Sequence, residues 1–279
     1  MKKNSKVEII DYDKFRVFDY PQDVSMVVAS GDIHGDFSFL IYKATQQYSI
    51  QNALIIVVGD CGFGFEKENY YHSLYKKNYK RLAEANVYIG FVRGNHDNPE
   101  YFRDSFINKE RWMTYPDYSI IHVAGKRLMI AGGAVSVDRS DRIKRENDKR
   151  RWKSSYSGRP ELKPALWWND EQFQFREDVI DNMRITGERF DTIITHTAPS
   201  FCEFISGGDV LSYFSENDEK LIEDVKEERH RVDLLYEHII SNGLPVKDWV
   251  YGHFHSSWHS KINEIMFSML DICELKELR

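Results

Sequence analysis

The stretch Val87-Tyr88-Ile89-Gly90-Phe91-Val92-Arg93-Gly94-Asn95-His96-Asp97 joins an apolar run to a polar quartet. The apolar run predicts a buried parallel strand, so the quartet follows its carboxyl end, where open α/β sheets bind ligands. An amide, an imidazole and a carboxylate side by side offer an oxygen ligand, a proton-transfer group and a group that can orient it. Gly-Asn is also a turn dipeptide, so the quartet alone is equally compatible with a plain strand-to-loop turn.

The same succession of an apolar run and a polar cluster recurs along the chain. It appears at Gly31-Asp32-Ile33-His34-Gly35, Gly59-Asp60, Thr195-His196 and Gly252-His253-Phe254-His255. Five of the ten histidines lie in the five clusters, which an ordinary role for histidine in the core does not explain. We therefore expect five strand ends to contribute to one site.

Composition narrows the class of protein. The 279 residues include 38 Lys+Arg and 44 Asp+Glu, and the net charge of −6 argues against broad, charge-driven binding of nucleic acid. No apolar run approaches the roughly 18 residues of a membrane span, and the amino terminus lacks the apolar core of a signal peptide. Three widely separated cysteines fit a reducing compartment. We expect a cytoplasmic protein without membrane partners.

We expect one domain over residues 1–279, with a basic loop or small insertion at about 139–165. Residues 139–153 hold eight Lys or Arg residues against three acidic ones. One interpretation is an anion-attracting flap near a phosphate site, and the other is a solvated surface loop.

Periodicity and capping signals predict the other elements. Helices are expected after an N-cap at Asp36, at about 66–86, from a capping box at Asn169 and Gln172 to about Arg184, and within 215–242. Strands are expected within 7–20, at 119–123 and 127–131, and as an antiparallel pair within 257–272. Residues 132–139 form another polar loop after a strand.

The donor types in the clusters favour a particular metal chemistry. Imidazoles, carboxylates and one carboxamide suit borderline transition ions such as manganese, iron, zinc, cobalt or nickel. Seven protein ligands exceed the needs of one tetrahedral ion but fill two sites if one carboxylate bridges. Two ions ~3.5–4 Å apart can activate a water and clamp a phosphoryl group.

In this order, Asp32-x-His34, Gly59-Asp60, Gly94-Asn95-His96-Asp97, His196 and Gly252-His253-x-His255 resemble the motifs of calcineurin-like metallophosphoesterases, the superfamily that includes the phosphoprotein phosphatases. The resemblance covers residues from about 26 to 272. It implies an α/β fold in which a two-sheet sandwich of mixed strands is flanked by helices. It also implies a dimetal site at the strand ends.

The resemblance further implies a role for each motif residue. The first ion would be bound by Asp32, His34 and His255, and the second by Asn95, His196 and His253, with Asp60 bridging both. His96 would donate a proton to the leaving oxygen, and Asp97 would orient its imidazole. The nucleophile would be a metal-bound hydroxide, and manganese is the favoured cofactor.

The second motif departs from that of phosphoprotein phosphatases. Gly59-Asp60 continues as Cys61-Gly62-Phe63-Gly64-Phe65, so the arginine expected there is missing. Arg93 and Arg139 are the remaining candidates for binding phosphate. We expect a phosphomonoester substrate, either protein-borne or a small molecule. The alternatives are a phosphodiesterase or nuclease on the same centre and, from another class, a non-catalytic binding scaffold.

Overall fold

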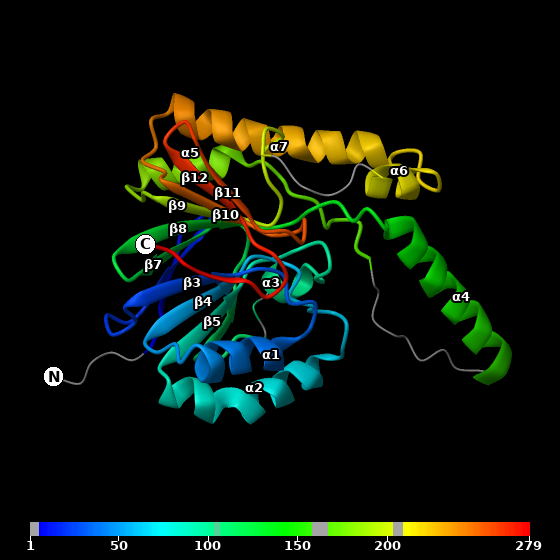
Figure 1. Cartoon of the computed structure of the whole chain (residues 1–279), viewed down its shortest axis with the longest axis horizontal. Helices are drawn as coiled ribbons and strands as arrows, with labels where there is room; N and C mark the ends of the chain where they lie inside the picture. The colour runs from blue at the N-terminus through cyan, green and yellow to red at the C-terminus, as the bar shows by residue number, and fades with distance from the viewer. Residues whose placement is uncertain (1–5, 104, 106, 158–166, 203–208) are drawn as a thin grey trace.

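Two β-sheets lie face to face, and helices cover their outer faces (Figure 1). The computed structural model describes residues 6–103, 105, 107–157, 167–202 and 209–279. Both sheets contain parallel and antiparallel strand pairs. This arrangement confirms the predicted α/β fold, a two-sheet sandwich of mixed strands flanked by helices.

The larger sheet has eight strands in the order β1-β2-β7-β8-β9-β10-β12-β11. Their bounds are β1 Glu8–Asp11, β2 Arg16–Asp19, β7 Ser119–Val123, β8 Lys126–Ala131, β9 Thr192–Thr195, β10 Asp248–Tyr251, β11 Trp258–Ile262 and β12 Ile265–Met269. The neighbours β8, β9 and β10 run parallel, so their carboxyl ends meet at one edge. The predicted hairpin of β7 and β8 and the predicted antiparallel pair of β11 and β12 are confirmed.

The smaller sheet has five strands in the order β13-β3-β4-β5-β6. Their bounds are β3 Met26–Ser30, β4 Ala53–Val57, β5 Val87–Phe91, β6 Trp112–Thr114 and β13 Leu275–Glu277. Strands β3 to β6 are parallel, which again gathers their carboxyl ends. Every residue of β4 and β5 is buried, which explains their continuous apolar sequence.

The core has three layers of buried side chains. Between the sheets, residues of the smaller sheet such as Leu54 and Ile56 pack in one cluster with residues of the larger sheet such as Ile130 and Val250. Helices α1 (Phe37–Tyr42) and α2 (Glu68–Glu84) cover the outside of the smaller sheet, and α5 (Glu177–Ile185) and α7 (Leu221–Ser241) cover the outside of the larger one (Figure 1). A π-helix at Lys43–Gln47 extends α1, and α3 (Glu100–Arg103) and α6 (Asp209–Ser215) are short.

Most predicted helices are confirmed. Asp36 caps α1 as expected, because its side chain accepts a hydrogen bond from the backbone N–H of Phe39. The capping box at Asn169 and Gln172 is wrong, since α5 begins only at Glu177. The intervening Glu171 is buried, and its carboxylate accepts hydrogen bonds from Ser136, so this segment is drawn into the core instead of starting a helix.

Helix α4 (Arg139–Ser157) projects away from the two-sheet body (Figure 1). The prediction of a loop is therefore wrong for these residues. The segment contains neither glycine nor proline, and eight of its residues are Lys or Arg, which favour a helix. Residues 158–165 of the predicted insertion lie outside the described residues. Within the described parts of the chain, we find no helix with the length and apolarity that a membrane crossing requires.

Candidate metal centre

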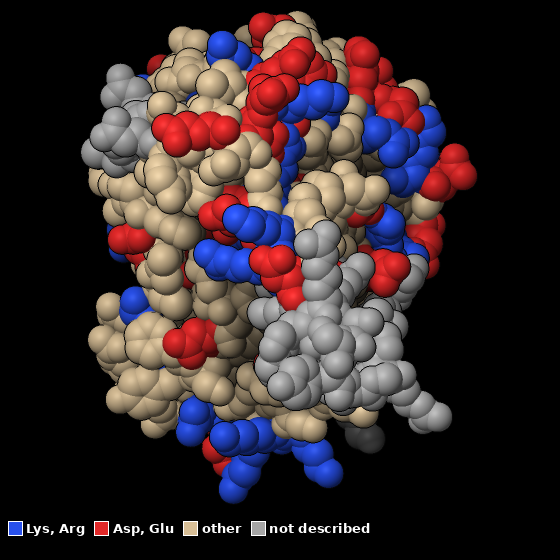
Figure 2. Space-filling model, turned by 90° about the vertical axis from the view of Figure 1, so that its right-hand side faces the viewer, with Lys and Arg blue, Asp and Glu red and all other residues tan. Residues whose placement is uncertain are grey.

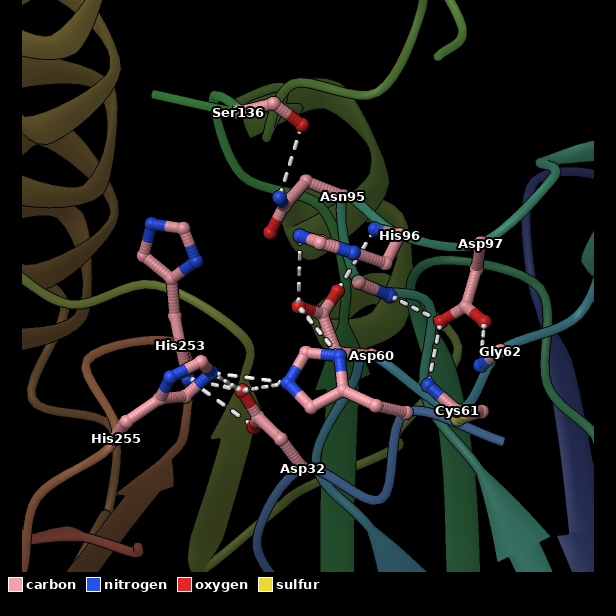
Figure 3. Close-up of polar contacts among 12 residues, drawn as sticks. Asp32, Asp60, Cys61, Gly62, Asn95, His96, Asp97, Ser136, His253 and His255 are labelled. Atoms are coloured by element: carbon pink, nitrogen blue, oxygen red, sulfur yellow. Dashed lines mark hydrogen bonds and ion pairs between the residues drawn. The ribbon is translucent and has the colours of Figure 1, made fainter. Parts of the chain in front are cut away.

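Seven predicted ligands converge where strands of both sheets end. Five of them, Asp32, Asp60, Asn95, His253 and His255, are labelled in Figure 3. The smaller sheet supplies Asp32 and His34 after β3, Asp60 after β4 and Asn95 after β5, and the larger sheet supplies His196 after β9 and His253 and His255 after β10. The predicted common site is therefore present. Because each ligand follows a parallel strand, the ends of two sheets define its position.

The first group of donors consists of Asp32, His34, Asp60 and His255, whose ligand atoms all lie within 4.8 Å of one another. The Nε2 atoms of His34 and His255 are 3.0 Å apart. His255 Nε2 lies 3.2 Å from Asp32 Oδ2, and His34 Nδ1 lies 4.0 Å from Asp60 Oδ2. Two imidazole nitrogens and two carboxylates that face one point make a donor set suited to a divalent transition ion.

The second group consists of Asp60, His196 and His253. His196 Nε2 lies 3.1 Å from Asp60 Oδ1 and 3.0 Å from Asn95 Oδ1, which brings the predicted carboxamide ligand to the same place. Asp60 belongs to both groups, with Oδ1 toward His196 and Oδ2 toward His34. These residues fit two ions that share one carboxylate.

A backbone hydrogen bond fixes the orientation of His196. Its Nδ1 lies 2.8 Å from the carbonyl oxygen of Val58, so Nδ1 carries the hydrogen and Nε2 faces Asp60. Burial opposes a charged imidazole, yet the carboxylates of Asp60 and Asp32 raise the pKa of His196 to about 9. A bound cation would replace that proton, so uptake of metal at neutral pH releases protons.

Asp60 is ionised in spite of complete burial. Burial favours the neutral acid, but the imidazoles of His96, His196 and His34 together lower the pKa of Asp60 well below its usual value. In contrast, burial and then the neighbouring His196 lower the pKa of His253 well below its usual value. The bridging oxygen donor and the His253 nitrogen donor are thus in their ligand forms at neutral pH.

Four ligand residues have left-handed backbone conformations, with φ of 45° at His34, 47° at Asp60, 68° at His253 and 48° at His255. Such conformations cost on the order of 1 kcal/mol each in non-glycine residues and gather at functional sites. Glycines beside the ligands permit close approach. A Cβ atom on Gly94 would lie 2.2 Å from Asp60 Oδ1, and one on Gly252 would lie 2.2 Å from Asp32 Oδ1.

Comparison with known families agrees with this geometry. The family model for calcineurin-like phosphoesterases matches residues 26–259, most of the chain. The chain belongs to this family.

Two solved structures are similar to this chain at low sequence identity. A phosphopantetheinyl hydrolase from Mycobacterium tuberculosis is 13% identical with a TM-score of 0.41, and the alignment covers 91% of this chain and 96% of that one. A dimetal phosphatase from Danio rerio is 12% identical with a TM-score of 0.42, covering 89% and 87% respectively. No curated protein matches the sequence.

In this calcineurin-like phosphoesterase, His96 stands beside the centre without joining either donor group. Its backbone N–H donates to Asp60 Oδ1 at 2.8 Å, and its Nε2 lies 3.7 Å from Asp60 Oδ2. Burial lowers the pKa of His96 to about 4; Asp60 opposes this shift and Arg142 reinforces it. The imidazole is therefore neutral at pH 7, and a neutral ring can still donate its N–H to a leaving oxygen.

The predicted role of Asp97 needs correction. Its carboxylate accepts backbone N–H groups from Gly62 and Phe63 at Oδ1 and from Cys61 and Gly94 at Oδ2, at 2.7–3.0 Å (Figure 3). The side chain thus holds the loop after Asp60 against the loop that carries His96. Asp97 shapes the site through the backbone and does not orient the imidazole.

Arg93 is also used differently from the prediction. Its guanidinium is buried and pairs with Asp117 at 2.8 Å. It also donates to the carbonyl oxygens of Glu171 at 2.6 Å and Gly132 at 3.3 Å. These contacts bind three segments of chain together, which gives Arg93 a structural role instead of the predicted open position for phosphate.

Arg139 is likewise occupied by carboxylates. It donates to both oxygens of Asp218, at 2.5 and 3.0 Å, and lies 2.6 Å from Asp224. The side-chain hydrogen bond to Asp218 is the main reason that the pKa of Arg139 is raised. The interaction anchors the start of α4 to the segment before α7, and the predicted phosphate contact of Arg139 would have to compete with these two carboxylates.

Sequence reasoning missed three site residues that follow β8 or touch its loop. Ser136 accepts a hydrogen bond from Asn95 (Figure 3). Glu171 accepts one from Ser136, and Arg142 contacts His96. The polar loop at residues 132–139 was a usable signal, since it repeats the succession of a strand and a polar cluster. The contacts of Glu171 and Arg142 carry no comparable signal, because they arise only from the tertiary fold.

Proposed function

We propose that the chain is a dimetal-dependent phosphomonoesterase, with manganese as the favoured ion and a phosphorylated protein or small molecule as substrate. The observation that carries the proposal is the position of Asp60, whose two oxygens face two separate sets of donors. A non-ligand imidazole, that of His96, stands beside the same carboxylate. This combination suits hydrolysis of a phosphate ester.

Different residues of the site would have different roles in such a reaction. When bound, two divalent ions would activate a water and neutralise phosphoryl charge. Asp60 holds its place through the N–H of His96, and Asp32 through the N–H of His253 at 3.1 Å, so both carboxylates are oriented before any substrate arrives. His96 is placed to give its ring hydrogen to the leaving oxygen.

A phosphodiesterase or nuclease on the same centre is the second candidate, supported by the Lys and Arg residues of α4. Surface charge weighs against it. Among the described residues on the face that carries α4, most Lys and Arg side chains in view lie beside Asp or Glu, and a further group of Lys and Arg lies at the lower edge (Figure 2). A nucleic-acid backbone is normally followed by a more continuous basic surface.

The decisive experiment is turnover by the purified protein after addition of manganese. We expect cleavage of p-nitrophenyl phosphate in preference to its bis-ester and to single-stranded DNA, with weak dependence on salt. Preference for the bis-ester or for DNA, with activity that falls steeply as salt rises, would favour the second candidate. Failure to bind metal by elemental analysis would instead favour a non-catalytic scaffold.

The three cysteines are free and buried, which supports the proposal of a cytoplasmic location. Cell fractionation tests this. Recovery of the protein in an oxidising compartment would contradict it.

A further inference from the structure

Arg142 lies in the first turns of α4, and its guanidinium faces the metal centre. Its Nη2 lies 2.7 Å from Nδ1 of His96 and also contacts Nε2 of the same ring. The residue is only 6% exposed, although α4 as a whole extends away from the body (Figure 1). One charged side chain of this helix is therefore turned inward, to the imidazole beside the bridging carboxylate.

The start of α4 is held firmly enough to aim that side chain. Arg139 and Ser140 both bind Asp218, at 2.5 Å and 3.1 Å. The Nε atom of Arg142 pairs with the carboxylate of Asp138 at 2.8 Å, one turn earlier. These contacts fix the arginine stem before substrate binds, which reduces the entropy lost on binding.

The segment after β8 also contacts Asn95, the residue before His96. Ser136 contacts Asn95, and Arg142, six positions later, contacts His96. The segment after β8 therefore contacts two adjacent residues that line the centre. Arg142 therefore lies on the same side of the site as His96, which is the proposed proton donor to the leaving oxygen.

We propose that Arg142 binds a non-bridging oxygen of the substrate phosphoryl group and thereby selects phosphomonoesters over diesters. The inference rests on the proposed function and deepens it. A monoester has three non-bridging oxygens and a diester has two. If two bound ions each took one oxygen, a third would remain only in the monoester, and the guanidinium of Arg142 would suit it in shape and charge.

The competing interpretation is that Arg142 only supports His96. The two interpretations differ in phosphate binding, since a support for the ring has no direct contact with the anion. Inorganic phosphate is the suitable probe, because it carries the same oxygens and does not depend on turnover. The nearby Arg145 is exposed on the same helix and provides a control of equal charge.

The test is calorimetric titration of inorganic phosphate into manganese-loaded wild type, Arg142→Gln, Arg142→Lys and Arg145→Gln. We expect Arg142→Gln to bind phosphate about 10- to 100-fold more weakly, the size expected for a lost charge-assisted hydrogen bond. The number of bound ions should stay the same, and Arg145→Gln should match wild type. The value of kcat/KM should fall similarly for p-nitrophenyl phosphate and less than about threefold for its bis-ester.

Unchanged phosphate affinity in Arg142→Gln with both ions present overturns the inference, as does an equal loss on both esters. If Arg142→Gln does not fold, Arg142→Lys decides, since it keeps the charge but loses the planar fork. Phosphate binding by Arg142→Lys equal to wild type would then reject the selective role. If wild type cleaves neither ester, the proposed function fails, while the phosphate titration still judges Arg142.

Discussion

Asn95 and Ser136 are joined by a hydrogen bond of 2.9 Å from the amide Nδ2 to the serine Oγ. Ser136 gives its single hydroxyl hydrogen to Glu171 Oε2 at 2.7 Å, so toward Asn95 it can only accept. The amide must therefore present Nδ2 to Ser136 and Oδ1 to the metal centre, where it lies 3.0 Å from His196 Nε2. A hydroxyl group outside the donor groups thus decides which atom of Asn95 faces a cation.

Replacement of Ser136 by alanine should weaken the binding of one of the two ions. The Asn95 amide loses the contact that fixes its orientation, and a loss of about 10- to 100-fold in affinity is typical for such outer contacts. Titration with manganese should show one weakened and one normal site. Ser73→Ala, on the exposed face of α2, is the control, and two unchanged sites in Ser136→Ala would contradict the assignment.

Replacement of Asp60 by alanine should remove metal binding and turnover together, because both donor groups depend on this carboxylate. Elemental analysis and p-nitrophenyl phosphate hydrolysis measure the two effects. Asp36→Asn keeps a good N-cap for α1 near the site and should retain both ions. Retention of two ions by Asp60→Ala would mean that the bridge is assigned wrongly.

Replacement of His96 by alanine should keep both ions but slow the reaction. Loss of a positioned proton donor typically costs about 10²- to 10⁴-fold, and the cost should grow as the leaving group becomes a stronger base. Rates for a series of aryl and alkyl phosphates test this dependence. The same loss for every leaving group would argue that His96 only supports Asp60.

Replacement of Arg93 by alanine should reduce stability and leave KM little changed. The buried guanidinium joins Asp117 to the carbonyl oxygens of Glu171 and Gly132, and removing one partner of such a pair costs on the order of 3 kcal/mol. Urea unfolding measures the loss. Arg103→Ala, which breaks a more exposed pair with Asp170, should cost under about 1 kcal/mol. A large rise in KM with normal stability would restore the phosphate-binding role.

Glu228 should make stability depend on pH. Burial, and then the nearby Glu171, raise the pKa of Glu228 to about 8. The folded state then binds this proton more tightly than the unfolded state, so stability decreases as pH rises from about 4.5 to about 8. Urea unfolding across this range should show a smaller decrease in Glu228→Gln. Identical pH dependence in both proteins would show that Glu228 ionises normally.

The sequence was most informative at the ends of parallel strands. An apolar run such as 87–92 identifies a buried strand, and parallel strands bring their carboxyl ends together, so five short motifs could be assigned to one place before any coordinates. Strands β6 and β13 have three residues each, too few for a periodic pattern, and were not predicted.

The arginines show where sequence reasoning stops. Arg93 pairs with a residue 24 positions away, and Arg139 with one 79 positions away, so nothing local reveals that their charges are already used. Asp97 shows a related limit, because adjacency to His96 in the chain does not make the two side chains face each other. Its oxygens instead accept N–H groups from residues 61–63.

Four of the ligand residues are attached to one sheet and three to the other. Cations bound between these residues would link the two sheets to each other, in addition to their role in the reaction. Anything that binds the folded form alone also shifts the unfolding equilibrium, so chelation should expose the chain to proteases. Removal of metal would then affect the protein in two ways: it would stop catalysis, and it would shorten the time for which the folded chain survives proteolysis.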